Sequence, residues 1–364
     1  MASLRQNEYQ PDYVSHPGGS LQDILDERRM PHSHLACRMG LSEKHVSNII
    51  TGKVGLTAEV AIALERVLGV PAGFWLTREA HYREYLARKA EQLRLEQDIS
   101  WTSHFPLREM ERLGYVKREQ DRLARLMCLL RFFGIASPSE FDAWWDRLQP
   151  SFRISSKKSP NLHALAAWLR KGEIEASSIE CSAFSRSGFT GMLPEIRAMT
   201  LHPPEVFQPK LASLCARHGV AVVFVPELPK SYVSGATRWL NEIKALIQLS
   251  LRYKTADMLW FAFFHEAYHV IRQQKRALFM RDDAGGDDTE EERKANDFAA
   301  NSLIPPSEYR AFAHGRLSER EIIAFSERIA IDPSVVIGRL QHDRYLPFNS
   351  KLSRLKTRFE WSIE

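Results

Sequence analysis

The feature that most constrains this chain is an apolar segment that carries two histidines four positions apart. Residues 261–271 read Phe-Ala-Phe-Phe-His-Glu-Ala-Tyr-His-Val-Ile, which predicts a buried helix. An α-helix has 3.6 residues per turn, so His265 and His269 lie on one face, one turn apart. Two imidazoles at this spacing can bind one Zn²⁺, and Glu266 beside them can act as a general base. An ordinary helix with two hydrogen-bonded histidines is the alternative, and this motif alone does not exclude it.

A catalytic zinc ion needs a third protein ligand and an open fourth position. We expect a second helix at residues 290–305, because small and apolar residues recur there at helical spacing. Glu292 lies three residues before Ala295 and shares its face, which makes it the candidate third ligand, with Glu291 as the alternative. The acidic loop at residues 282–288 is interpreted as a solvated connection, with substrate steering or a second metal as alternatives.

Three short segments precede these helices and are predicted to be strands, at residues 220–225, 234–239 and 244–249, of which the first is apolar and rich in β-branched residues. Together with the two helices, they give several separated blocks in a fixed order. From about residue 211 to 306 the chain resembles the ImmA/IrrE family of metallopeptidases. The blocks that carry the resemblance are Val225-Pro226-Glu227-Leu228-Pro229, Ser234-Gly235-Ala236, His265-Glu266-x-x-His269 and Glu292-x-x-Ala295-Asn296-x-Phe298-Ala299-Ala300.

The resemblance implies a zincin-like domain with a small mixed sheet. It also implies one Zn²⁺ per chain, or alternatively Mn²⁺, held by His265, His269 and Glu292, with Glu266 as the catalytic base.

The chain departs from the family pattern at three positions. Ala267 and Tyr268 replace the usual Leu-Gly, and Lys294 stands where an acidic residue is common. None of these removes a ligand, but Tyr268 is expected to narrow the cleft. No donor for an oxyanion stands out, and the candidates are only His218, Tyr232 and Arg238.

The N-terminal part is predicted to be a cluster of five helices. They begin near Ser20, at Pro31, at Glu43, at Thr57 and at Pro71. Gly40 ends the second helix and permits a tight turn into residues 43–50, which is the pattern of a helix-turn-helix module. Residues 43–50 are then the recognition helix. The candidate DNA contacts are Ser42, Lys44, His45, Asn48 and Lys53.

Residues 15–88 resemble the HigA-type antitoxin branch of the Cro/C1 helix-turn-helix family. The resemblance rests on His16-Pro17-Gly18, Val46-Ser47-Asn48-Ile49-Ile50-x-Gly52-Lys53, Thr57-Ala58-Glu59-x-Ala61-x-x-Leu64 and Phe74-Trp75-Leu76. It implies DNA binding. Residues 1–70 hold seven Lys and Arg against eight Asp and Glu, a net charge of −1, so a monomer should bind DNA weakly and we expect a homodimer. A helical interaction domain that has lost DNA binding is the alternative.

The remaining sequence sets the fold class and the boundaries. We expect an α+β, mainly α-helical chain with four parts: residues 1–95, the helix-turn-helix domain; 96–208, a helical middle region; 209–310, the peptidase core; and 311–364, a helical extension. In the middle region, helices are expected at residues 119–133, 139–148 and 161–170, without assigned chemistry. The basic stretch at residues 339–358 is interpreted as a solvated tail, with nucleic-acid contact as the alternative.

Composition points to the cytoplasm. Residues 1–10 are polar and lack the apolar core of a secretory signal, and no apolar run is long enough to cross a bilayer. The four cysteines are scattered without Cys-x-x-Cys spacing, so reduced thiols are expected rather than a Cys-rich zinc site.

Two functions follow as hypotheses. The first is a zinc endopeptidase coupled to a DNA-binding module, cleaving a repressor or antitoxin-like protein in stress response, toxin–antitoxin or phage-related control. The alternative is a transcriptional repressor or antitoxin whose peptidase-like domain is a sensor or partner-binding module that cleaves nothing.

Overall fold

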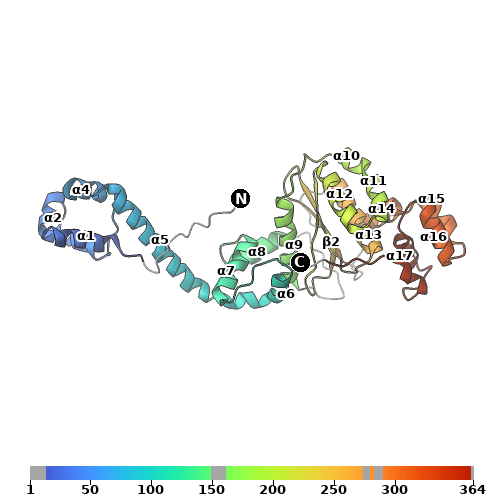
Figure 1. Cartoon of the computed structure of the whole chain (residues 1–364), viewed down its shortest axis with the longest axis horizontal. Helices are drawn as coiled ribbons and strands as arrows, with labels where there is room; N and C mark the ends of the chain where they lie inside the picture. The colour runs from blue at the N-terminus through green and yellow to red at the C-terminus, as the bar shows by residue number, and fades with distance from the viewer. Residues whose placement is uncertain (1–13, 149–160, 274–278, 283–289, 362–364) are drawn as a thin grey trace. The chain divides into compact units, whose positions relative to one another are not determined.

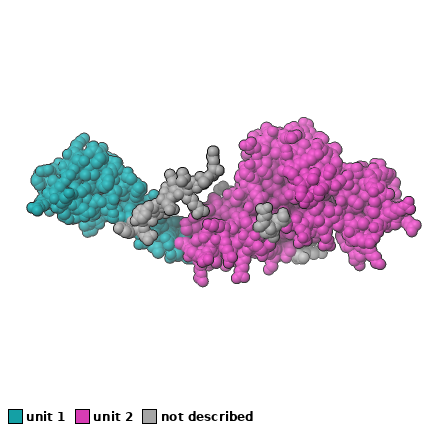
Figure 2. Space-filling model, in the orientation of Figure 1, with its two compact units in different colours: residues 1–99 teal, residues 100–364 magenta. Residues whose placement is uncertain are grey.

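The chain forms two compact units, residues 1–99 and 100–364 (Figure 2). The computed structural model describes residues 14–148, 161–273, 279–282 and 290–361. Helices dominate both units, and the second unit also contains a small sheet, so the α+β, mainly helical fold class is confirmed. None of the described helices is long and apolar enough to cross a membrane.

The first unit is a cluster of five helices around one apolar core (Figure 1). They are α1 (Pro17–Glu27), α2 (His32–Met39), α3 (Glu43–Ile50), α4 (Ala58–Leu68) and α5 (Ala72–Glu96). Gly40 has the left-handed φ of 65° that the tight turn between α2 and α3 requires. Ser42 caps α3 by accepting a hydrogen bond from the His45 N–H at 3.1 Å, as its position in the sequence predicts.

The first helix begins earlier than the sequence pattern predicts. Pro17 occupies its first position, where the ring fixes a helical φ, and His16 is the N-cap. The Gly18 N–H donates to His16 Nδ1 at 2.8 Å. Ser20 is therefore inside the helix. A histidine cap is hard to recognise in a sequence because Ser, Thr, Asp and Asn dominate this position.

The second unit is built on a four-stranded mixed sheet with strand order β1-β3-β2-β4. The strands are β1 (Val220–Phe224), β2 (Val233–Trp239), β3 (Ala245–Leu249) and β4 (Phe279–Asp282). β1 runs parallel to β3, whereas β2 is antiparallel to both β3 and β4. The first three strands lie where the sequence predicts them. β4 was not predicted.

One face of the sheet is covered by the helices that carry the candidate metal ligands. α13 (Ala256–Ile271) packs on β2 and β3, and α14 (Glu290–Leu303) packs on α13. α12 (Pro204–Ala216) lies on β1. The core between them is aromatic and aliphatic, with Trp260, Phe263 and Phe264 almost fully buried.

The other face of the sheet is covered by helices from the preceding hundred residues. These are α6 (Leu107–Arg112), α7 (Arg122–Phe133), α8 (Pro138–Leu148) and α9 (Leu162–Ser177). α9 packs directly on β1 and β3. A Cβ atom at Gly172 would lie 1.9 Å from Gln248 Oε1, so glycine permits this close approach. The helical region to which we assign no chemistry from sequence thus covers one face of the sheet.

Shorter helices complete the second unit. They are η1 (Ile99–His104), α10 (Arg186–Gly191), α11 (Leu193–Ala198), η3 (Met199–Leu201), α15 (Pro306–Ala313), α16 (Glu319–Arg328), α17 (Pro333–His342) and η4 (Lys351–Leu355). Ser318 begins α16 with a complete capping box, and Asp332 caps α17. α17 packs on α13.

The basic C-terminal stretch is not a solvated tail, which corrects the sequence interpretation. The Ala256 N–H donates to Thr357 O at 3.0 Å, and the Phe359 N–H donates to Lys254 O at 2.9 Å. Lys356 Nζ lies 2.6 Å from Asp257 Oδ2, and both side chains are largely buried. This stretch therefore ties down the first turn of α13. Its positive charge is used in part within the fold.

Candidate metal centre

Helix α13 is fixed against the sheet at the position of Glu266. Thr237 Oγ1 of β2 donates to Glu266 O at 3.2 Å in a buried contact. A Cβ atom at Gly235 would lie 3.0 Å from Glu266 Cγ, so β2 passes close to this side chain. Glu266 is fully buried, at 0% exposure. The helix face that carries both histidines is thereby held in one orientation.

Three side chains converge at one point between α13 and α14. His265 Nε2 lies 3.0 Å from Glu292 Oε2, and His269 Nε2 lies 3.5 Å from Glu292 Oε1. The two histidine Nε2 atoms are 3.3 Å apart. Of the residues that the structure describes, these three form the group of His, Cys, Asp or Glu side chains that could hold a metal ion, with ligand atoms within 4.8 Å of one another.

The second helix delivers Glu292 because small residues let it approach the first. Ala295 and Ala299 are fully buried in the contact between α14 and α13. Glu291, the alternative ligand, points elsewhere and lies 3.5 Å from Arg272 Nε. The geometry therefore favours Glu292, as its phase relative to Ala295 predicts.

The electrostatics of the site favour a neutral imidazole at His269. Burial, together with the neighbouring His265, lowers the pKa of His269 to about 3, although the Glu292 carboxylate acts in the opposite direction. A neutral imidazole has the free lone pair that a metal requires. Two imidazole nitrogens and one carboxylate oxygen form a donor set that suits Zn²⁺ and leaves a position for a reactant. The residues therefore fit the metal that the sequence implies.

Asn296 takes a part that the sequence did not assign. Its Oδ1 lies 3.0 Å from His265 Nδ1. If Nδ1 carries the proton and donates it to this amide oxygen, Nε2 is left to face Glu292 and a metal. The sequence contains a signal for this role, because Asn296 lies one helical turn after Glu292 and so shares its face.

Of the three residues that depart from the family pattern, Ala267 is buried in the core, whereas Tyr268 and Lys294 lie nearer the surface. The ring of Tyr268 packs on Phe298, with centroids 5.6 Å apart. Burial and the charge of Glu291 raise the pKa of Tyr268, so it remains a neutral phenol. Lys294 Nζ pairs with Glu290 at 2.6 Å on the exposed side of α14. The acidic loop at residues 283–288 lies outside the described residues.

Arg238 is not an oxyanion donor, contrary to one of the sequence suggestions. Its guanidinium pairs with Glu173 of α9 at 2.8 Å, on the face of the sheet opposite to α13. Tyr232 has a left-handed φ of 53°, and the guanidinium carbon of Arg252 lies 5.2 Å from the centroid of its ring. His218 lies beside Gly188, before β1. None of these three contacts involves the metal ligands.

The candidate DNA-contacting residues gather on and around α3. Ser42, Lys44 and Lys53 are exposed, whereas His45 and Asn48 are half-buried. The Lys53 N–H donates to Asn48 O at 2.9 Å, which holds the residues after α3 against the helix end. Val46 and Ile49 on the opposite face are buried in the core of the unit.

The arrangement of β1–β3, α13 and α14 agrees with the result of a comparison with protein families. Residues 215–364 match the family model Peptidase_M78, described as the IrrE N-terminal-like domain. The match begins within α12 and includes all three candidate ligands. It continues through α17, beyond the boundary near residue 310 that the sequence suggested. This region therefore resembles metallopeptidase-like domains of the IrrE/ImmA kind.

The N-terminal region resembles helix-turn-helix regulators and HigA-type antitoxins. Over 60 residues the chain is 37% identical to the HTH-type transcriptional regulator YddM of Escherichia coli strain K12. The matched segment covers 16% of this chain and 64% of the length of that regulator. The chain thus joins a regulator-like region to a metallopeptidase-like domain.

Two solved structures are similar to part of the chain. The HigA-family antidote protein of Coxiella burnetii is 26% identical, with 23% of this chain and 92% of that chain covered, at a TM-score of 0.22. The Pseudomonas aeruginosa antitoxin HigA, solved with the higBA promoter, is 28% identical, with 23% and 94% covered, also at 0.22. These TM-scores are too low to support a structural argument.

Proposed function

We propose that the chain is a zinc-dependent endopeptidase joined to a DNA-binding regulator module. The observation that carries the proposal is the convergence of His265, His269 and Glu292, with the fully buried Glu266 next to His265 in α13. We further propose that the substrate is a repressor or antitoxin-like protein. Support for this substrate comes from the regulator-like N-terminal region, because a peptidase fused to such a module can be brought to other regulatory proteins.

Each residue of the site has a separate role in the proposed reaction. His265, His269 and Glu292 would hold the metal, which supplies Lewis-acid catalysis when bound. Glu266 is the general base: it accepts a proton from the attacking water and passes it to the leaving amine. Asn296 holds the ring of His265 in the orientation that directs Nε2 toward the site. The aromatic and aliphatic core beneath α13 keeps these groups from moving apart.

The DNA-binding half of the proposal rests on α3 and its surroundings. Exposed Lys44 and Lys53 can neutralise phosphates, and Asn48 can read a base edge from the same helix face. Because residues 1–70 carry a net charge of −1, affinity should come from a homodimer occupying two half-sites. The likeness to YddM supports a role in transcription regulation.

The test compares the purified full chain with Glu266→Gln, which removes the base and leaves the three candidate ligands in place. Zinc content should be equal, and only the unchanged chain should cleave the partner encoded next to its gene. Equal action of the two proteins on that partner would overturn the peptidase proposal.

The likeness to a transcriptional regulator favours one alternative, a repressor whose metal domain senses a signal without cleavage. In that case Glu266→Gln keeps regulation, whereas Asn48→Ala on α3 abolishes it. A reporter driven by the promoter of its own gene separates the two functions.

A further inference from the structure

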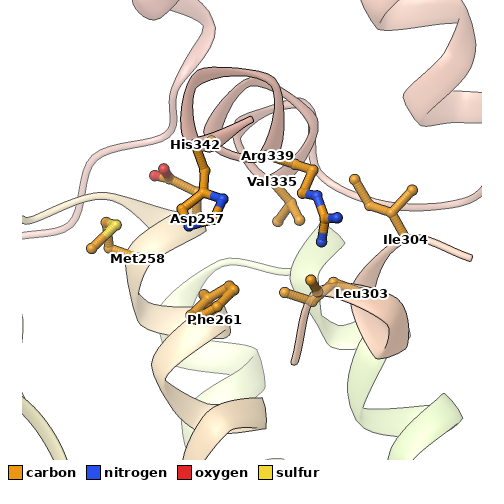
Figure 3. Close-up of a pocket in the computed structure, with 10 residues that line it drawn as sticks. Asp257, Met258, Phe261, Leu303, Ile304, Val335, Arg339 and His342 are labelled. Atoms are coloured by element: carbon orange, nitrogen blue, oxygen red, sulfur yellow. The ribbon is translucent and has the colours of Figure 1, made fainter. Parts of the chain in front are cut away.

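A small cavity lies between α17 and the two helices that carry the candidate metal ligands, α13 and α14 (Figure 3). Its volume is about 70 Å³, and it is partly open to solvent. Phe261 of α13 and Leu303 of α14 form one side, and Val335 of α17 forms the other. Met258, Ala300 and Ile304 add further apolar surface, and Asp257, Arg339 and His342 are the polar lining residues. An apolar lining with a few polar groups is typical of a site for a small organic ligand.

Arg339 and His342 of α17 line this cavity. Figure 3 shows the guanidinium of Arg339 extending toward Leu303 and Ile304. The side chain of His342 is 75% exposed, and its Nδ1 lies 2.9 Å from Asp343 Oδ1. Arg339 is held in place on two sides. Its Nε donates to Asp343 Oδ2 at 2.7 Å, and its guanidinium lies 5.0 Å from the centre of the Tyr309 ring. A fixed guanidinium is well suited to bind a carboxylate.

The one acidic side chain that lines the cavity is already neutralised. Asp257 is buried, and its Oδ2 accepts a hydrogen bond from Lys356 Nζ at 2.6 Å. In Figure 3 its oxygens point away from Arg339. A Cβ atom at Gly338 would lie 2.4 Å from Asp257 Oδ2, so glycine allows α17 to close over this carboxylate. The cavity therefore offers the guanidinium of Arg339, which is ion-paired to Asp343 through Nε, and an apolar interior.

We propose that this cavity binds a small monocarboxylic acid with an aryl or branched-alkyl body. The body packs among Phe261, Leu303 and Val335, and the carboxylate binds the guanidinium of Arg339. This binding site is separate from the metal ligands and does not depend on the peptidase activity.

The position of the cavity gives the ligand a route to the metal centre. Phe261 precedes His265 by one helical turn, and their ring centroids are 6.4 Å apart. Ala300 of the cavity wall follows Asn296 by one turn of α14. A ligand that fills the cavity thus contacts both helices next to the groups that orient His265. The bound acid is therefore a regulator of metal affinity.

The test uses 3-phenylpropionate as the probe and 3-phenylpropylamine as its charge-reversed control, with the full chain and its Glu266→Gln variant. Titration calorimetry should show saturable binding of the acid by both proteins and none of the amine. The affinity for Zn²⁺, measured by competition with a chromophoric chelator, should change at saturating acid. Binding of the amine in place of the acid would overturn the proposal, because Asp257 would then be the head-group partner.

Substitutions of the lining residues test whether the acid binds in this cavity. Arg339→Gln should weaken binding of the acid about 10-fold or more, as expected for loss of a charge-assisted hydrogen bond. Ala300→Phe should abolish binding by filling the cavity. Arg328→Gln is the matched control, because Arg328 also lies over an aromatic ring, Phe325 at 5.2 Å, but does not line the cavity.

Thermal unfolding of each variant checks that it folds. If Arg339→Gln does not fold, binding of the acid by Ala300→Phe tests whether the cavity is the binding site. Undiminished binding of the acid by the folded variants would place it elsewhere and overturn the proposal. Unchanged Zn²⁺ affinity at saturating acid would overturn the regulatory part.

Discussion

The two faces of the sheet use buried polar groups in opposite ways. On the α9 face, two buried side-chain donors each bond to a single backbone oxygen: Trp168 Nε1 donates to Val225 O at 3.0 Å, and Gln248 Nε2 donates to Trp168 O at 2.6 Å. On the α13 face, the polar atoms of His265 and His269 converge on the carboxylate of Glu292 instead. The comparison indicates that buried polarity marks a functional site where ligand atoms meet at one point, and a structural contact where they pair off.

The sharpest test of this comparison is Glu266→Gln on the α13 face. Loss of the general base should reduce peptide cleavage by about 10²–10⁴-fold, since this is the usual contribution of such a group. Stability and zinc content should hardly change, because the amide has nearly the same shape. Cleavage rates with the cognate partner, and metal content by atomic absorption, measure the two effects separately.

On the α9 face, Trp168→Ala should affect stability instead. Trp168 is fully buried, and its removal should lower the free energy of unfolding by about 3–5 kcal/mol. Urea unfolding measures this change, and Trp168→Phe serves as a control that keeps most of the volume. Zinc bound per folded molecule should be unchanged in both. If the folded fraction of Trp168→Ala loses its metal, the two faces are coupled and the contrast between them fails.

Asn296→Ala should have a smaller effect that is confined to the metal. Without the amide oxygen at 3.0 Å, the ring of His265 loses its orientation, and zinc affinity should fall by about 10–100-fold. Competition with a chelator of known affinity measures the change. Asn301→Ala, at an exposed position of the same helix, is the control and should bind zinc normally.

The smallest effect is expected from Glu173→Gln at the ion pair with Arg238. Burial alone would raise the pKa of Glu173, but Arg238 and Arg170 outweigh it and hold the pKa below its usual value. A lowered folded-state pKa gives stabilisation that is present above the unfolded pKa and is lost as the pH falls through the folded pKa.

In Glu173→Gln, therefore, the stability loss relative to the unchanged chain should be about 1 kcal/mol or less at neutral pH. The loss should shrink further in acid. Unfolding midpoints measured from neutral pH down to pH 3 test this, and a constant difference across that range would contradict it.

Much of the α13 face could be predicted from sequence because its signals are local. The spacing of His265 and His269, and the phase of Glu292 relative to Ala295, both follow from helix geometry alone. Asn296 could have been found in the same way, from its position one turn after Glu292. The first predicted strand, at residues 220–225, also rested on a contiguous apolar run.

The rest depended on contacts between distant residues. Arg238 looked like a possible catalytic donor until its pairing with Glu173, on another helix, placed it on the far face of the sheet. The basic stretch near Lys356 looked like a tail because nothing in its composition reveals a buried partner at Asp257. The short strand β4 has no pattern of its own and exists only by pairing with β2.

The bond between Lys356 and Asp257 also sets an order of events during synthesis. The two residues are 99 positions apart, so a ribosome must add that much chain after Asp257 before its ionic partner exists. The helix-turn-helix unit, with its own core, emerges and can fold long before then. All three candidate metal ligands are also made earlier. A nascent chain therefore passes through an interval in which the helix-turn-helix unit is complete, while the first turn of α13 still lacks its ion pair with Lys356.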